Sequence, residues 1–168
     1  MDRDWDIDSF QSSDYTKRPI SIHICAYRNA SNAGDEEGNP PTNHWAAFFK
    51  LEGGRSVRIN MSPGYGSDGR RGKIVLSSRN YAYTQNAIKA LSFPIIRSTT
   101  VQTFINLINN NGREREGCRY WIYTIISDFD AAGHIGSGSG QATWDAISYY
   151  WRHPSGSEPR EVGRGVFR

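Results

Sequence analysis

The sequence predicts an α+β domain with an antiparallel sheet, because strand-like segments come first and helix-like segments follow. Between residues 19 and 92, short runs alternate apolar and polar side chains, which is the pattern of a half-buried strand. From residue 99 onward, apolar residues recur at helical spacing. The length of 168 residues suits one domain. We therefore expect an antiparallel meander sheet packed by two or three helices.

The strand-like segments occupy residues 19–27, 44–51, 56–61, 73–77 and 86–92. In the first of them, Ile22 and Ile24 share one side, while His23 and Cys25 share the other. The second and third flank a Gly-Gly turn and are predicted to form a hairpin, and the fourth extends it into a meander. Residues rich in Gly, Pro, Asn and acids, at 28–42 and 62–69, are expected to form loops.

Three segments carry helical periodicity. A threonine cap precedes the first, over residues 101–108. The second starts near residues 114–117 and carries Cys118 in its first turn. The third is expected over about residues 141–151, after a Gly-Ser connector at residues 136–140.

Charge and composition limit the domain plan and the partners. Residues 1–17 are expected to form a polar arm, residues 18–153 the domain, and residues 154–168 a polar tail. The net charge of +3 comes from interspersed acids and bases, so we expect no nucleic-acid partner, although steep salt dependence of such binding would reverse that expectation. No apolar run approaches the roughly 20 residues of a membrane span, and the acidic start does not resemble a secretory signal. Two cysteines are too few for a disulfide scaffold, and a cytoplasmic location is expected.

Cys118 is the candidate nucleophile. In the first turn of a helix, free backbone N–H groups and the helix dipole favour a thiolate. The amides of the same turn can stabilise an oxyanion on an attacked carbonyl group. The alternative interpretation is a small buried side chain, which a free cysteine often is.

His44 and Asn60 are the candidate base and its orienting group. His44 begins an apolar strand, and Asn60 lies on the next strand of the hairpin, where cross-strand neighbours come within hydrogen-bond reach. An asparagine carbonyl oxygen can hold the imidazole tautomer that a Cys-His-Asn arrangement requires. Taken singly, each residue also suits an ordinary boundary or solvent-facing position.

Other ligand-binding patterns are weaker. Two histidines and two cysteines are candidate zinc ligands: His23, Cys25, His44 and Cys118. They lack the paired spacing of a zinc site, and we expect neither a metal nor an organic cofactor. The Gly-Ser run at residues 136–140 can cradle a phosphate at a helix start but lacks the lysine of a P-loop. Tyr27 or Arg28 can bind a substrate if the first strand borders a cleft.

Two segments resemble the sequence boxes of the lecithin–retinol acyltransferase-like proteins, circularly permuted relatives of papain and of the bacterial cell-wall cysteine peptidases. Residues 44–49 (HWAAFF) and 57–63 (VRINMSP) are similar to the histidine box of that family. Asn60 stands where the family usually has a second histidine. Residues 117–122 (GCRYWI) are similar to the cysteine box, usually Asn-Cys-Glu-His-Phe-Val.

The resemblance implies a permuted papain-like fold and a thiol-dependent acyl hydrolase or acyltransferase that acts on an amide or ester, or a cyclising or condensing variant. Cys118 is then the nucleophile, His44 the base and Asn60 its orienting residue. Four residues are expected to contact a small-molecule or peptide substrate: Trp45, Tyr120, Trp121 and Arg28. The alternative is a non-catalytic ligand- or protein-binding module on the same fold.

Overall fold

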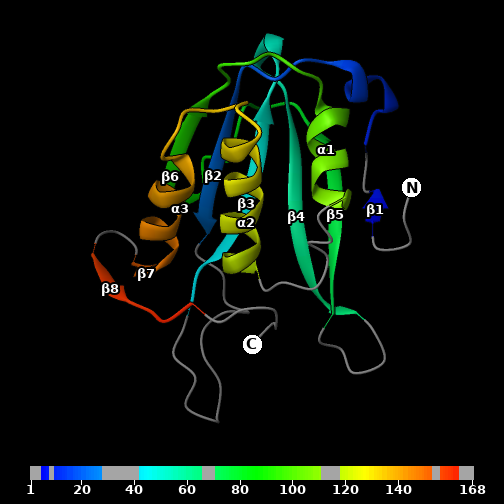
Figure 1. Ribbon diagram of the computed structural model, residues 1–168. Helices are drawn as coiled ribbons and strands as arrows, with labels where there is room; N and C mark the ends of the chain where they lie inside the picture. The colour runs from blue at the N-terminus through cyan, green and yellow to red at the C-terminus, as the bar shows by residue number, and fades with distance from the viewer. Residues whose placement is uncertain are drawn as a thin grey trace.

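Three helices lie against one face of a six-stranded sheet in the computed structural model, which describes residues 5–7, 10–27, 42–65, 71–110, 118–152 and 156–162 (Figure 1). The predicted α+β class is confirmed. Within these described ranges, no helix has the length and hydropathy needed to cross a membrane.

The sheet has the strand order β1-β5-β4-β3-β2-β6. Its strands are β1 (Trp5–Ile7), β2 (Ser21–Tyr27), β3 (His44–Lys50), β4 (Ser56–Tyr65), β5 (Arg71–Arg79) and β6 (Ala87–Pro94). The predicted meander is β3-β4-β5, joined by antiparallel pairing. The turn between β3 and β4 is the short 3-10 helix η3 (Glu52–Gly54), in which Gly53 has a positive φ of 76°. Strand β6 lies beyond β2 and pairs with it, whereas β1 adds a parallel edge beside β5.

Alternation along the strands gives the sheet two different faces. In β3, Trp45 and Phe49 belong to the large core cluster beneath the helices. Ala46 and Phe48 belong to a second cluster with Cys25, on the face that the helices do not cover. We call this second surface the helix-free face.

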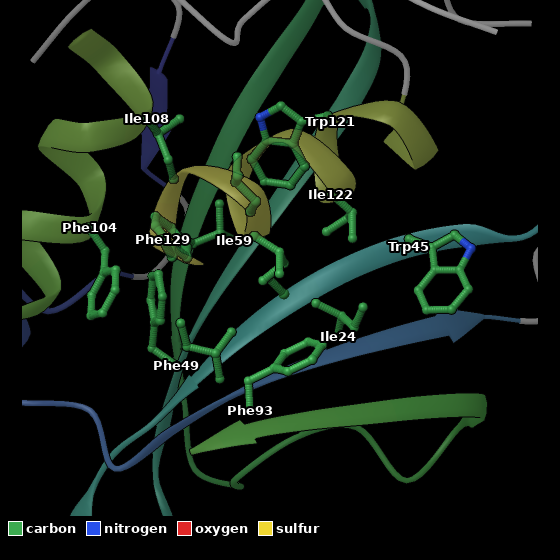
Figure 2. Close-up of a cluster of buried hydrophobic side chains, with 14 of the residues drawn as sticks. Ile24, Trp45, Phe49, Ile59, Phe93, Phe104, Ile108, Trp121, Ile122 and Phe129 are labelled. Atoms are coloured by element: carbon green, nitrogen blue, oxygen red, sulfur yellow. The ribbon is translucent and has the colours of Figure 1, made fainter. Parts of the chain in front are cut away.

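The helices are α1 (Val101–Asn110), α2 (Cys118–Ala131) and α3 (Ser139–Ile147). The ring of Phe49 lies 5.1 Å from that of Phe104, which in turn lies 4.7 Å from the ring of Phe129 (Figure 2). Burial of each ring stabilises the fold by about 2 to 3 kcal/mol. The predicted cap of α1 is Thr100, whose Oγ1 accepts the N–H of Thr103 at 3.3 Å.

The Gly-Ser run belongs to the start of α3 and is not a loose connector. The Oδ2 atom of Asp130 accepts the backbone N–H groups of Gly138 and Gly140, both at 3.1 Å. A carboxylate of the chain itself therefore occupies the position that an external phosphate would take at this helix start.

The expected helix over residues 141–151 is too long. Helix α3 ends at Ile147, and β7 (Tyr149–Trp151) follows and pairs with β8 (Ser157–Pro159). The buried Asn43 side chain accepts the N–H of Trp151 at 2.7 Å and donates to its carbonyl oxygen at 3.0 Å. These two bonds hold the backbone of Trp151 extended beside the start of β3.

The segment expected to be an irregular arm contains β1 and the 3-10 helix η1 (Ser12–Thr16). The buried carboxylate of Asp14 in η1 accepts two bonds from the Arg55 guanidinium, at 3.0 and 2.9 Å, and one from the Ser78 hydroxyl at 2.6 Å. Lys17 adds an ion pair at 3.0 Å. Residues 163–168 of the predicted polar tail lie outside the described residues.

Candidate functional site

His44 and Asn60 are joined by a hydrogen bond between Nε2 of the imidazole and Oδ1 of the amide. Because an amide oxygen can only accept, Nε2 carries the proton and Nδ1 carries the lone pair. In the described part of the chain, Nδ1 has no hydrogen-bond partner. The ring is therefore held in one tautomer with an acceptor directed away from Asn60.

Sheet register explains why these two side chains meet. Asn60 pairs directly with Ala46, and His44 lies two residues before Ala46 on the same face of β3. Diagonal neighbours on adjacent strands are within reach of an imidazole. Since Trp45 faces the helices, both His44 and Asn60 lie on the helix-free face.

Burial sets the protonation state of His44. It lowers the pKa of the imidazole from the ordinary value of 6.5, and the positive charge of Arg58 lowers it further. The bond to Asn60 opposes this shift but does not cancel it. The neutral form, with Nδ1 available as an acceptor or base, is thus favoured at neutral pH.

Two further side chains complete the site. The ring of Tyr27 lies 6.0 Å from the ring of His44, and Cζ of Arg58 lies 5.7 Å from the centroid of Tyr27. Burial raises the pKa of Tyr27 to about 12, so its hydroxyl stays protonated, and this hydroxyl is hydrogen-bonded to the side chain of Thr84. We call the four residues Tyr27, His44, Arg58 and Asn60 the His44 cluster.

The sequence pattern alone places Arg58 on the same face as Asn60. Arg58 precedes Asn60 by two residues on a strand, so the two side chains share a face. A charged residue between the core residues Val57 and Ile59 also has to lie on the face opposite theirs. Tyr27 was identified as a conditional substrate-binding residue, but its contact with His44 depends on the pairing of β2 with β3.

Cys118 is the first residue of α2, which confirms its predicted position in the first turn of a helix. Its side chain lies outside the described residues, so its pairing with His44 stays a prediction. Figure 2 shows Trp45, the neighbour of His44, at the end of α2 that carries Trp121 and Ile122. The start of β3 and the first turns of α2 thus pack together, but on the face opposite to the imidazole.

The expected substrate-contacting residues have other positions. Trp45 and Trp121 are 0% exposed and belong to the core, which corrects the prediction that they contact a substrate (Figure 2). Tyr120 is half-buried, with its ring 5.8 Å from that of Tyr123. Arg28 lies outside the described residues.

His23 and Cys25, which also lie on the helix-free face, make structural contacts. His23 is hydrogen-bonded to the Ser21 hydroxyl at 2.9 Å and stacks on Tyr83 at 4.4 Å. Cys25 is fully buried, and burial raises its pKa to about 12. Across the ranges that the structure covers, no three His, Cys, Asp or Glu side chains gather closely enough to hold a metal ion.

Fold and site together define an α+β domain with a hydrogen-bonded His-Asn pair on the helix-free face of its sheet. The chain belongs to the DUF7770 family, described as a domain of unknown function, whose model matches residues 22–168. No curated protein and no solved structure matches the chain. The matched range includes every member of the His44 cluster.

Proposed function

We propose that this protein is a ligand-binding domain, and that the His44 cluster is its binding site for a small molecule. The observation that carries the proposal is the His44–Asn60 hydrogen bond, which fixes the ring and leaves Nδ1 free of partners among the described residues. A fixed acceptor beside a partly buried aromatic ring and a guanidinium group provides the aromatic surface and the few placed polar groups by which small-molecule sites fix a ligand.

The surroundings of the cluster also support binding. Tyr27, His44, Arg58 and Asn60 are each only partly buried, so each presents part of its surface to solvent. Ala46, which pairs with Asn60 across the sheet, is fully buried on this face. The face opposite, by contrast, is filled by the packed core beneath the helices.

Fragment titration followed by two-dimensional NMR tests this function. The panel contains neutral, anionic and cationic fragments: N-methylacetamide, phenol, acetate, benzoate and benzylamine. We expect at least one class to shift the backbone signals of Tyr27, Ala46 and Asn60, and His44→Gln to abolish those shifts. His23→Gln is the matched control, because it removes a second histidine from the same face and should leave binding intact. No binding at millimolar concentration, or shifts confined to another region, would refute the proposal.

A second candidate is the thiol-dependent acyl hydrolase or acyltransferase on a permuted papain-like fold. The observation in its favour is the tautomer of His44, since a base that takes a proton from a thiol needs a free ring nitrogen while its other N–H is held. Cys118, as the first residue of α2, also has the backbone environment that favours a thiolate. Because the ring of His44 is on the helix-free face and α2 packs on the other face, this function needs the two residues to meet at the end of β3 where His44 begins the strand.

Thiol labelling separates the two candidates. If Cys118 and His44 form an ion pair, iodoacetamide should label Cys118 at slightly acidic pH at least about tenfold faster than a model thiol, and His44→Gln should remove the excess rate. His23→Gln again serves as the control. A rate equal to that of a model thiol, unchanged in His44→Gln, leaves only the binding function.

A further inference from the structure

We propose that the ligand of the His44 cluster is a small carboxylate with a neighbouring hydrogen-bond donor, and that Arg58 is the residue that binds its carboxylate group. This inference rests on the proposed binding function and specifies its ligand class. It comes from the contacts of Arg58, from the charges around it and from the free ring nitrogen of His44.

Among the described residues, Arg58 lacks the hydrogen-bond and ion-pair partners that a partly buried arginine normally has. Its Nε atom is buried, and within the described part of the chain it has no hydrogen-bond partner. The ion pairs of the described residues involve Asp14 and Glu158, not Arg58. Among the described residues, its guanidinium contacts the ring of Tyr27, with Cζ 5.7 Å from the ring centroid. A buried donor of a charged group without an acceptor is costly, and a bound acceptor would remove that cost.

The charges around Arg58 favour an anion with one negative charge. Tyr27 is protonated, Asn60 is uncharged and His44 is favoured in its neutral form, so none of these neighbours compensates the guanidinium. The positive charge is felt locally, because it lowers the pKa values of both Tyr27 and His44. A positive charge that the described neighbours leave uncompensated, in a partly dehydrated site, matches a carboxylate better than a phosphate of higher charge.

Geometry favours the same class. The planar fork of a guanidinium presents Nε–H and an Nη–H side by side, which matches the two oxygens of a carboxylate. Across the Tyr27 ring, Nδ1 of His44 can only accept while His44 is neutral and its Nε2–H is bound to Asn60. A ligand that satisfies both groups therefore carries a carboxylate together with an O–H or N–H donor.

Three matched probes test this on the unmodified chain by NMR titration. N-acetylglycine carries the carboxylate and an amide N–H, N-acetylglycinamide lacks the negative charge, and N-acetylsarcosine lacks that N–H. We expect the first to bind at least about tenfold more tightly than either of the others, since one charge-assisted or neutral hydrogen bond is lost in each. Equal affinity of N-acetylglycine and its amide would overturn the inference.

Variants of Arg58 give the second readout. Arg58→Gln should weaken binding of N-acetylglycine by about 10- to 100-fold and leave binding of the neutral amide unchanged. Arg58→Lys should give an intermediate loss, because lysine keeps the charge but not the fork. Arg18→Gln, which removes an exposed arginine outside the cluster, is the charge-matched control. Unchanged acid binding in a folded Arg58→Gln protein would contradict the role of Arg58.

The two proposals fail in different ways. If neutral fragments bind at the cluster but the carboxylate has no advantage, the binding function stands and the carboxylate assignment is overturned. If no fragment of any charge shifts the signals of the cluster, the binding function itself is refuted. The comparison of acid with amide needs no mutation, so a variant that fails to fold does not block the test.

Discussion

Replacing Asp14 by Asn tests whether the N-terminal segment is held to the sheet mainly by charge. The carboxylate is buried, and it receives hydrogen bonds from Arg55 and Ser78 and an ion pair from Lys17. Burial alone would raise the pKa of Asp14, but these partners outweigh burial and lower it from 3.8 to about 2. Asparagine keeps the size of the side chain and removes the charge.

The shift in pKa gives the size of the effect. A group that titrates nearly two units lower in the folded state stabilises the fold by about 2 kcal/mol at neutral pH. Loss of one partner of a fully buried pair can cost about 3 to 5 kcal/mol. The Arg55 side chain is 23% exposed and can be hydrated in the variant, so we expect a value near the lower figure.

Urea unfolding of both proteins at several pH values measures this difference. Because the folded pKa lies below the unfolded one, the contribution of Asp14 is complete above pH 3.8 and is lost as the pH falls through about 2. The two proteins should therefore converge in acid. Asp145→Asn, at an exposed position of α3, is the control and should change stability by less than about 0.5 kcal/mol. A difference that is the same at neutral and acidic pH would refute the charge argument.

Three further predictions concern a helix cap, a thiol and a histidine. Asp130→Ala should lower the free energy of unfolding, measured in urea, by about 1 to 2 kcal/mol, because two N–H groups at the start of α3 lose their acceptor. A loss of stability no larger than that of Asp145→Ala would contradict this prediction. In a Cys118→Ser variant, iodoacetamide should label Cys25 only after the protein unfolds, because Cys25 is buried and burial raises its pKa to about 12. Mass spectrometry measures the labelling, and labelling of the native protein at the rate of a model thiol would disprove this prediction. Stability measured in urea should fall as the pH drops below 6.5, because burial lowers the pKa of His44 and of His23, so the unfolded chain binds these protons more tightly. His44→Gln should make this part of the curve less steep and leave the share of His23, and an unaltered curve would argue against it.

Local patterns were sufficient to predict the central part of the sheet. Alternation placed Ile22 and Ile24 on one side of β2 and His23 and Cys25 on the other, and the structure has the first pair in the core beneath the helices. The hairpin register then predicted that His44 and Asn60 would be within hydrogen-bond reach, as they are. These features depend on residues that are close in sequence or joined by a short turn.

Features that depend on distant contacts were missed. The spacing of Trp144, Ile147 and Trp151 is helical, yet the last of them lies in β7 because Asn43, 108 positions earlier, binds its backbone. The resemblance implies that Trp45 contacts a substrate, and the local sequence does not tell which face of β3 the helices cover. The covered face of β3 is determined by the packing of α2, which follows β3 in the sequence by almost seventy residues.

The position of β6 at the far edge has a consequence for synthesis of the protein on the ribosome. Strand β3 is synthesised soon after β2 and pairs with one side of it, whereas β6, which pairs with the other side, ends only at Pro94. Until that residue has emerged, a nascent chain presents the unpaired N–H and C=O groups of an apolar strand to any neighbouring polypeptide. Pairing with β6 covers that edge, so the sheet is completed only after residues 87–94 have joined it.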